Sequence, residues 1–346
     1  MKLHKLTLVT LFLSTVITTK VFADCTCERD EITGNKNQAL AYKLIALVSI
    51  LVAGSIGVSL PFASNIFPAL HPEKDDFFLV KAFAAGVILA TGFIHILPDA
   101  FENLKSPCLK EHPWADFPFT GFVAMVATIA TQMFESLSLA YERKDKTETD
   151  VKLGGGGEDE EKGGRVHTNH QHVHGSFVLP NEDESQVYRY RIISKVLELG
   201  IIVHSVIIGL SLGVSKSPKT IKPLIVALSF HQFFEGLGLG GCIFQAKIKY
   251  VAVILMGVFF AFTTPSGILI GIFVSKTYEE DTPTALIVQG VLNAAASGIL
   301  IYMALVDLIS PDFKNQRMQN NKILLLSSSV SLLVGAGLMS LLAKWA

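Results

Sequence analysis

The sequence predicts an all-α membrane protein with eight transmembrane helices. Half of its 346 residues are apolar and only 17% are charged, whereas an ordinary soluble domain has about 25% charged residues. Eight segments each hold the roughly 20 mainly apolar residues that a helix needs to cross a lipid bilayer. The formal net charge of −1 gives no indication of nucleic-acid binding. The composition and the apolar segments together make the lipid bilayer the expected environment of the chain.

The eight apolar segments follow one another through mostly short, polar connections. They are residues 40–63, 77–97, 117–140, 192–214, 222–245, 250–275, 284–309 and 322–343. Turn-forming residues fill connections such as SKSPKT and EEDTPT. The predicted organisation is a region 24–140 with spans 1–3, a long loop 141–190, and a region 191–346 with spans 4–8.

The long loop between the third and fourth spans differs in composition from the rest. It holds charged runs, the glycines of GGGG and a cluster of histidines. Such a segment cannot bury enough apolar surface to fold alone. We expect residues 141–190 to be disordered.

Residues 1–23 form a predicted signal peptide. Two lysines precede the apolar run LTLVTLFLSTVI, and VFA before Asp24 resembles a small-residue cleavage site. Cleavage would place Cys25 and Cys27 outside the cytosol. A disulfide from one of them to Cys108, or free thiols throughout, are both compatible with the sequence.

The charges of the loops favour one orientation only mildly. With the N-terminus outside, the long loop and the basic loops AKIKY and FKNQRMQNNK face the cytosol, as the positive-inside rule predicts. The loop SKSPKTIK then faces outward, against that rule. The predicted signal peptide therefore carries more of the orientation argument.

Ionisable side chains inside the predicted spans are few, and each costs roughly 2.5–3.5 kcal/mol on insertion. They are Lys81, His95, Glu135, Glu198, His204, His231, Glu235 and Asp307. Four of them lie within about two turns of a helix end, where snorkelling or pairing at the interface is the simpler explanation: Lys81, Glu135, Glu198 and Asp307. The three histidines and Glu235 predict a functional site.

The helical period places two His–carboxylate pairs on single helix faces. His231 and Glu235 are four residues apart in SFHQFFEGLGLGG, and His95 and Asp99 repeat the spacing at the end of the second span. His204 adds a third imidazole on the fourth span. Because imidazole nitrogen and carboxylate oxygen together suit zinc, iron or manganese, we predict metal ligation rather than purely structural hydrogen bonding.

Glycines follow both histidines at a regular spacing. Residues 209–213, GLSLG, and 236–240, GLGLG, are both Gly-x-x-x-Gly motifs. Small residues at this spacing let helix backbones approach closely in lipid. We expect these glycines to bring neighbouring helices close to the polar site.

On these motifs the sequence resembles a plant member of the ZIP family, the zinc- and iron-regulated transporter-like proteins. The resemblance rests on GFIHILPDAFE, VLELGIIVHSVIIGLSLG, SFHQFFEGLGLGGC and TTPSGILIG, and extends from about residue 40 to the end. It implies eight spans with extracytosolic termini, inverted repeats of spans 1–3 and 6–8, and a metal path between the second, fourth, fifth and seventh helices. It also implies a homodimer. We expect a membrane of the secretory pathway, with the plasma membrane as the first choice.

The implied function is import of divalent transition-metal cations into the cytosol. Zinc is the first choice, with iron(II) or manganese as alternatives. The metal is the transported substrate, and no resident cofactor is expected.

The resemblance also assigns roles to particular residues. His204, His231 and Glu235 match the main transport site, with Ser205 and Gln232 beside them; His95 and Asp99 match the entrance path, and Glu102 lies at its mouth. Some relatives have carboxylates of a second metal site where this chain has Ile208 and Thr264. A single-metal site is therefore expected.

A second group of histidines lies in the long loop, in the motif HTNHQHVH. It comprises His167, His170, His172 and His174. Alternating histidines on a flexible segment bind zinc transiently. We expect a regulatory role near the cytosolic exit.

Two other classes of function use similar residues. An intramembrane zinc hydrolase needs a motif such as H-E-x-x-H, but Gln232 occupies the position of the catalytic base, so no enzyme is expected. A metal-sensing receptor without transport would share every motif. Only a measurement of metal flux separates it from a transporter.

Overall fold

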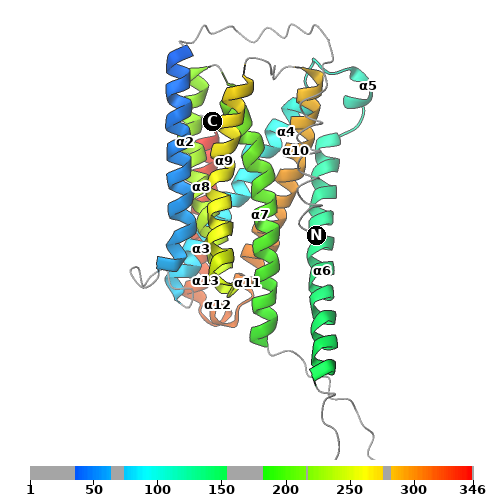
Figure 1. The fold of residues 1–346 in the computed structure, drawn as a ribbon, viewed down its shortest axis with the longest axis vertical. Coiled ribbons are helices and arrows are strands. Elements are labelled where there is room, and N and C mark those ends of the chain that lie inside the picture. Colours follow the sequence, from blue (N-terminus) through cyan, green and yellow to red (C-terminus); the bar gives the residue numbers. More distant parts are fainter. Residues whose placement is uncertain (1–35, 64–73, 154–181, 216, 276–281, 345–346) are drawn as a thin grey trace, which may run out of the picture.

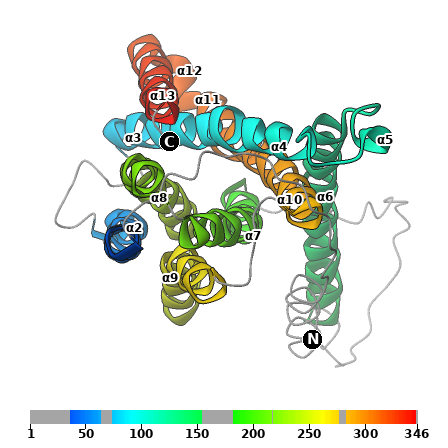
Figure 2. The same ribbon diagram turned by 90° about the horizontal axis from the view of Figure 1, so that it is seen from above.

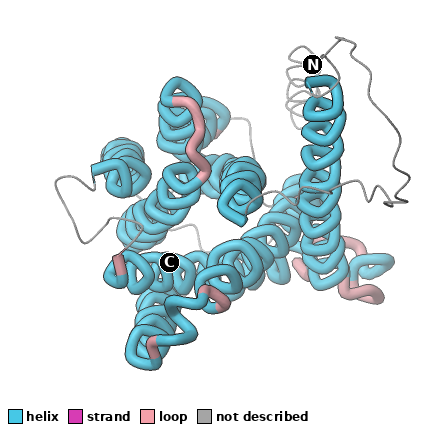
Figure 3. The backbone as a smooth tube through the Cα atoms, turned by 90° about the horizontal axis from the view of Figure 1, so that it is seen from below, coloured by secondary structure: helices cyan, strands magenta, loops and turns pink. Residues whose placement is uncertain are grey.

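The computed structural model describes residues 36–63, 74–153, 182–215, 217–275 and 282–344. Every regular element among them is a helix, as Figure 3 shows. The predicted signal peptide, Cys25, Cys27 and the four loop histidines lie outside the described residues.

Eight long helical segments correspond to the eight predicted spans. Six are continuous helices: α2 (Lys36–Ser59), α6 (Phe119–Leu153), α7 (Glu182–Val214), α8 (Pro218–Gln245), α9 (Tyr250–Val274) and α13 (Lys322–Ala343). The second segment joins α3 (Asp75–Ala90), η3 (Thr91–Ile96) and α4 (Leu97–Leu104). The seventh joins α10 (Pro283–Tyr302), η4 (Met303–Ile309) and α11 (Ser310–Phe313). Successive segments run in opposite directions (Figure 1).

Three short helices lie outside the long segments. η1 (Leu60–Ala63) continues α2, α5 (Glu111–Trp114) lies between α4 and α6, and α12 (Gln316–Asn320) lies between α11 and α13. Asn321 caps α13 by accepting a hydrogen bond from the backbone N–H of Leu324. Asn321 is therefore the N-cap of the last long helix and follows directly after α12.

Six helical segments of the described chain are long and apolar enough to cross a membrane. They are Asn37–Ala63, Asp75–Leu104, Tyr190–Val214, Tyr250–Val274, Pro283–Phe313 and Lys322–Ala343. The other two long helices, α6 and α8, are not among these six, and α8 carries the polar residues His231, Gln232 and Glu235 in its middle. The multi-pass membrane architecture is therefore confirmed by length and composition.

The loop predicted between the third and fourth spans is shorter than residues 141–190. Helix α6 continues to Leu153 and α7 already begins at Glu182. These extensions are rich in Glu, Lys and Arg, which are good helix formers and prolong a helix that apolar residues have started. Both helices therefore extend into the segment 141–190.

The helices form two groups. Helices α2, α7, α8 and α9 pack together, with α2 against α8 and α7 against α9. In the second group, α13 packs on α3, and α6 packs on α10. Figure 2 shows α3, α4 and α10 as a wall beside the first group, with α6 and α13 on its outer side. Contacts of α3 with α8 and of α10 with α7 join the two groups.

Glycines lie where the paired helices cross most closely. A Cβ atom on Gly213 of α7 would lie 2.7 Å from Cα of Gly271 in α9, and a Cβ atom on Gly240 of α8 would lie 2.4 Å from the Val58 carbonyl oxygen in α2. No side chain fits at such distances, so close approach requires glycine. The glycines thus bring α7 onto α9 and α8 onto α2, and each histidine helix is fixed against its own neighbour.

Two helices are interrupted by π-helical segments, each just before a proline. In η3, the N–H of Leu97 donates to the carbonyl of Gly92, five residues earlier, and Ser297 Oγ donates to the same carbonyl over 3.1 Å. Proline cannot donate a backbone hydrogen bond, and π-turns are frequent at functional sites. In η4 the N–H of Ser310 likewise donates to the carbonyl of Leu305.

Three charged side chains that the sequence placed at the interface are buried inside the bundle. Lys81, Glu135 and Asp307 are 2%, 6% and 1% exposed. Lys81 pairs with Asp312 at 2.9 Å, and Tyr302 donates to Glu135 over 2.6 Å. Of the two expected explanations, the structure supports pairing rather than snorkelling for Lys81 and Glu135, and helix packing covers these positions although they lie near helix ends in the sequence.

Candidate metal centre

His204, His231 and Glu235 converge in the interior of the first helix group. His204 lies on α7, and His231 and Glu235 lie one turn apart on α8. Each side chain offers one ligand atom, and these atoms lie within 4.8 Å of one another. The ring centroids of the two histidines are 5.8 Å apart. The spacing of four residues on α8 therefore puts both of its ligands on the face that meets α7.

These three side chains are buried, and several of their polar atoms lack a partner. His204, His231 and Glu235 are at most 3% exposed. Among the described residues, neither ring nitrogen of His204, nor Nδ1 of His231, nor either carboxylate oxygen of Glu235 has a hydrogen-bond partner. Leaving such groups buried and unpaired is unfavourable. Their arrangement fits a site whose polar atoms are satisfied by a bound cation.

The geometry is close to that of a zinc site. Zinc binds His nitrogen and carboxylate oxygen at about 2.0–2.2 Å, so two ligand atoms of one tetrahedral ion lie about 3.4 Å apart. Separations up to 4.8 Å need only small side-chain rotations to reach this value. Three protein ligands leave a fourth position open, as expected of a site that must accept and release its ion.

His95 lies next to the cluster on the α4 side. Its ring centroid is 6.5 Å from that of His231, and its Nε2 has no hydrogen-bond partner among the described residues. Asp99 and Glu102 follow on α4 and are exposed. The predicted entrance residues therefore lie in order from the cluster toward the α4 end of the bundle.

The two remaining predicted site residues occupy different surroundings. Ser205 is buried on α7 beside His204. Gln232 is also buried, but its Oε1 accepts a hydrogen bond from Thr264 of α9 over 3.2 Å, and its side chain lies against Gly54 of α2. Gln232 is thus turned toward α2 and α9, and its carbonyl oxygen is already engaged.

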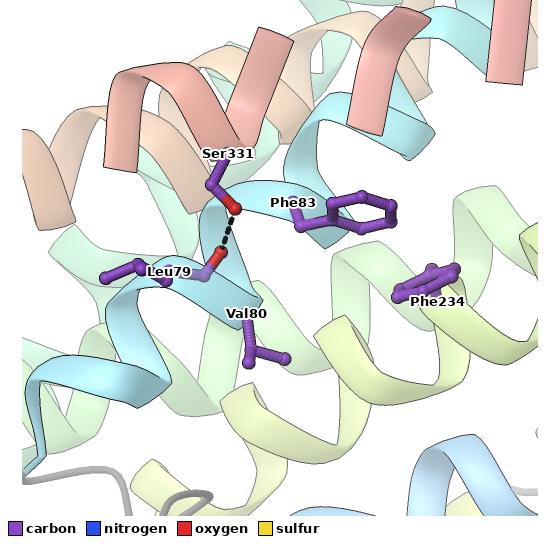
Figure 4. Close-up of a pocket in the computed structure, with 5 residues that line it drawn as sticks. All are labelled: Leu79, Val80, Phe83, Phe234 and Ser331. Atoms are coloured by element: carbon purple, nitrogen blue, oxygen red, sulfur yellow. Dashed lines mark hydrogen bonds between the residues drawn. The ribbon is translucent and has the colours of Figure 1, made fainter. Parts of the chain in front are cut away.

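A shallow pocket where α3, α8 and α13 meet offers no ligand set. Figure 4 shows it lined by Leu79, Val80, Phe83, Phe234 and Ser331, and the Ser331 hydroxyl donates to the Leu79 carbonyl over 2.7 Å. The rings of Phe83 and Phe234 have centroids 4.6 Å apart. The pocket is an apolar seam between the two helix groups.

The contacts that fix the surroundings of the site could not be predicted from the sequence. Thr264 replaces a carboxylate of some relatives and also bonds Gln232, and Asp312 is a further buried charge beyond those expected from the sequence. The signal for Asp312 was present, because Pro311–Asp312 repeats the Pro98–Asp99 pair of the second span. The partner of each residue becomes visible only once the helices are packed.

A bundle of membrane helices with a buried His–His–carboxylate cluster defines a membrane protein that handles divalent metal cations. Comparison with known families agrees with this class. Residues 40–343 match the ZIP zinc transporter family, and the chain belongs to that family. The family consists of transporters rather than enzymes, in agreement with the sequence analysis.

Curated plant proteins match almost the whole chain. Zinc transporter 5 of Oryza sativa subsp. japonica is 49% identical, over 94% of this chain and 92% of its own length. Zinc transporter 3 of Arabidopsis thaliana is 50% identical, over 93% and 90%. Probable zinc transporter 12 of Arabidopsis thaliana is 52% identical, over 90% and 88%.

Proposed function

We propose that the protein moves divalent transition-metal cations, zinc first, across a membrane into the cytosol. The observation that carries the proposal is the cluster of His204, His231 and Glu235, which is buried between α7 and α8 with unpartnered polar atoms. The names of the plant relatives support zinc as the substrate. Iron(II) and manganese accept the same mixed nitrogen and oxygen ligands and are the alternatives to test.

The chain crosses the membrane eight times in this proposal, and the α4–α5 end faces away from the cytosol. Cys108, between α4 and α5, is disulfide-bonded, and disulfides persist in oxidising compartments rather than in the cytosol. The opposite end carries the basic residues Lys247, Lys249 and Arg317, as the positive-inside rule favours for cytosolic loops. Both the start of α2 and the end of α13 then lie on the extracytosolic side. The basic loop 215–222 lies there too, against the positive-inside rule.

A cation would enter past Glu102, Asp99 and His95 and then reach the buried cluster. The exposed carboxylates attract the hydrated ion, and the imidazoles replace its water molecules. His204, His231 and Glu235 hold the ion in the interior of the bundle. Because neutral imidazole and ionised carboxylate are the ligating forms, binding competes with protons.

Location and assembly follow the family resemblance. We propose a homodimer in the plasma membrane, which surface labelling and chemical cross-linking of the purified protein test directly. A metal-sensing receptor would have the same cluster, and net flux separates the two functions.

The decisive experiment measures radioactive zinc uptake in a microbial host that lacks its own zinc importers. His204→Ala and Glu235→Ala should each reduce uptake by at least tenfold, because each removes a ligand of the only ion. Competition with unlabelled iron(II), manganese and cobalt gives the order of preference. Surface biotinylation shows whether each variant reaches the membrane.

Matched controls exist on the exposed helix α5 and its neighbourhood. His112→Ala and Glu111→Ala remove the same two side-chain types from exposed positions and should leave uptake unchanged. Native uptake by both cluster variants at native surface levels would refute the assignment of the site. Absence of uptake by the native protein itself would refute transport.

A further inference from the structure

A buried ion pair lies at the α11 end of the bundle, outside the cluster of His204, His231 and Glu235. Lys81 of α3 places its Nζ 2.9 Å from Oδ1 of Asp312 in α11, and the two side chains are 2% and 10% exposed. The same Nζ lies 5.4 Å from the ring centroid of Tyr190 in α7. A lysine in such surroundings is unfavourable unless it is paired. The pair therefore places two opposite charges between α3, α7 and α11.

The ion pair lies further along the helix face that carries the metal ligands. Cys242 follows Glu235 by seven residues, so it projects from the same face of α8 about 10 Å further along the axis. Cys242 is fully buried, and a Cβ atom on the neighbouring Gly241 would lie 3.1 Å from the ring of Phe77, one helical turn before Lys81 on α3. A cation that leaves the cluster along α8 in this direction meets the pair.

The two ends of the cluster differ in how tightly they are closed. Toward α4, His95 is half-buried and Asp99 is exposed. Toward α11, the fully buried Ile88 and Leu308 come together beside Gly238, whose position allows 3.4 Å and 3.9 Å contacts from a Cβ to their methyl groups. The structure is thus closed on the side of the ion pair and more open on the side of the entrance.

The ion pair also occupies the counterpart of the entrance in the second half of the chain. His95 is the fifth residue of η3, and Asp307 is the fifth residue of η4. A proline and an aspartate follow each π-helix, with Asp99 in the first case and Asp312 in the second. The entrance aspartate is exposed, whereas Asp312 is covered and neutralised by Lys81.

We propose that the Lys81–Asp312 ion pair is the inner gate of the metal path. Its contact closes the route between Cys242 and the cytosol while the cluster is reached from the α4 end, and it opens when the metal leaves. While the gate is closed, Lys81 occupies the carboxylate of Asp312, and Asp307 and Asp312 receive the cation once the lysine moves away. This inference rests on the proposed function for the direction of transport, but its test requires no transport.

Cys242 provides a native reporter of the gate. In inside-out membrane vesicles, a membrane-impermeant maleimide reaches only cysteines that are accessible from the cytosolic side, and a Cys242→Ala protein gives the background. Lys81→Met and Asp312→Asn should each increase the labelling rate of Cys242 at least fivefold. Lys81→Arg keeps the charge and should label as slowly as the native protein.

The exchanged protein K81D/D312K restores a pair of opposite charges and should return labelling toward the slow native rate. Each variant is compared after its elution from a sizing column has been shown to match the native protein. Native labelling rates in both Lys81→Met and Asp312→Asn, or fast labelling that persists in the exchanged protein, would overturn the gate. Zinc uptake by the native protein, measured in parallel, tests the proposed function separately.

Discussion

Thr264 in α9 donates a hydrogen bond to Gln232 in α8 over 3.2 Å, and both side chains are 1% exposed. Gln232 directly follows the ligand His231, so a different rotamer would bring its carbonyl oxygen toward the cluster. The threonine hydroxyl holds that oxygen toward α9. The bond therefore leaves His204, His231 and Glu235 as the candidate ligands of the cluster.

Thr264→Val should change metal preference without abolishing transport. The substitution keeps the shape of the side chain but removes the hydroxyl, at a cost of about 1 kcal/mol in stability. The freed amide oxygen of Gln232 would then be available as an additional hard ligand, which favours manganese relative to zinc. In competition uptake, manganese should inhibit zinc uptake by the variant at lower concentrations than in the native protein.

Thr263→Val is the matched control for this prediction. The Thr263 hydroxyl donates to the Phe259 carbonyl of its own helix over 2.6 Å and does not bond Gln232. Its loss should leave the competition profile unchanged. An equal shift in both valine variants would show that the effect comes from α9 as a whole and would contradict the role of the Thr264 bond.

The core of the site was predictable from sequence because its residues follow a local rule. His231 and Glu235 lie four apart on one helix, and that spacing alone places them on one face. That His204 meets them depends on the packing of α7 beside α8, and only the family resemblance indicated it. The orientation of Gln232 was not predictable, because a residue between two faces of a helix is placed by its neighbours in α2 and α9.

The positions of the long helices could be predicted from the hydropathy of the sequence. The eight long helical segments overlap the eight apolar stretches of the sequence, and six of them are apolar enough to cross a membrane. The pairing of α7 with α9 and of α8 with α2 was not predictable from composition, because Gly-x-x-x-Gly motifs indicate a close crossing without identifying the partner helix. The partners of Lys81 and Glu135 were not predictable for the same reason.

Gly213→Ala should weaken the α7–α9 crossing. The added methyl group would lie 2.4 Å from the Ile268 carbonyl oxygen and 2.7 Å from Gly271 Cα, so the helices must separate. Overpacking of this kind costs about 1–3 kcal/mol. The thermal denaturation temperature of the detergent-solubilised protein should fall, and zinc uptake should fall with it, because α7 carries His204.

Gly337→Ala serves as its control, because a Cβ atom there would have nothing within 4 Å. The control should denature at the native temperature or slightly higher, since alanine favours the helical state over glycine. If Gly213→Ala were as stable as Gly337→Ala, the close crossing of α7 and α9 would be refuted.

Tyr302→Phe should destabilise the contact between α6 and α10. The tyrosine hydroxyl donates to the buried carboxylate of Glu135 over 2.6 Å, and loss of a donor to a buried charged group costs about 1–3 kcal/mol. The denaturation temperature should drop while the metal preference stays native, because neither residue lies in the cluster. Tyr250→Phe, at an exposed position, should change neither property. A variant with native stability but altered metal preference would contradict a structural role.

Zinc uptake should weaken as the external solution becomes acidic. Imidazole nitrogen and carboxylate oxygen each bind either a proton or a metal ion. As the pH falls from about 7.5 to 5.5, protons therefore compete with zinc for the ligands of the path, and the apparent KM for zinc should rise. Saturating zinc should restore the maximal rate, because the competition is reversible. Uptake that increases on acidification at every zinc concentration would contradict this prediction and would indicate that protons drive the transport.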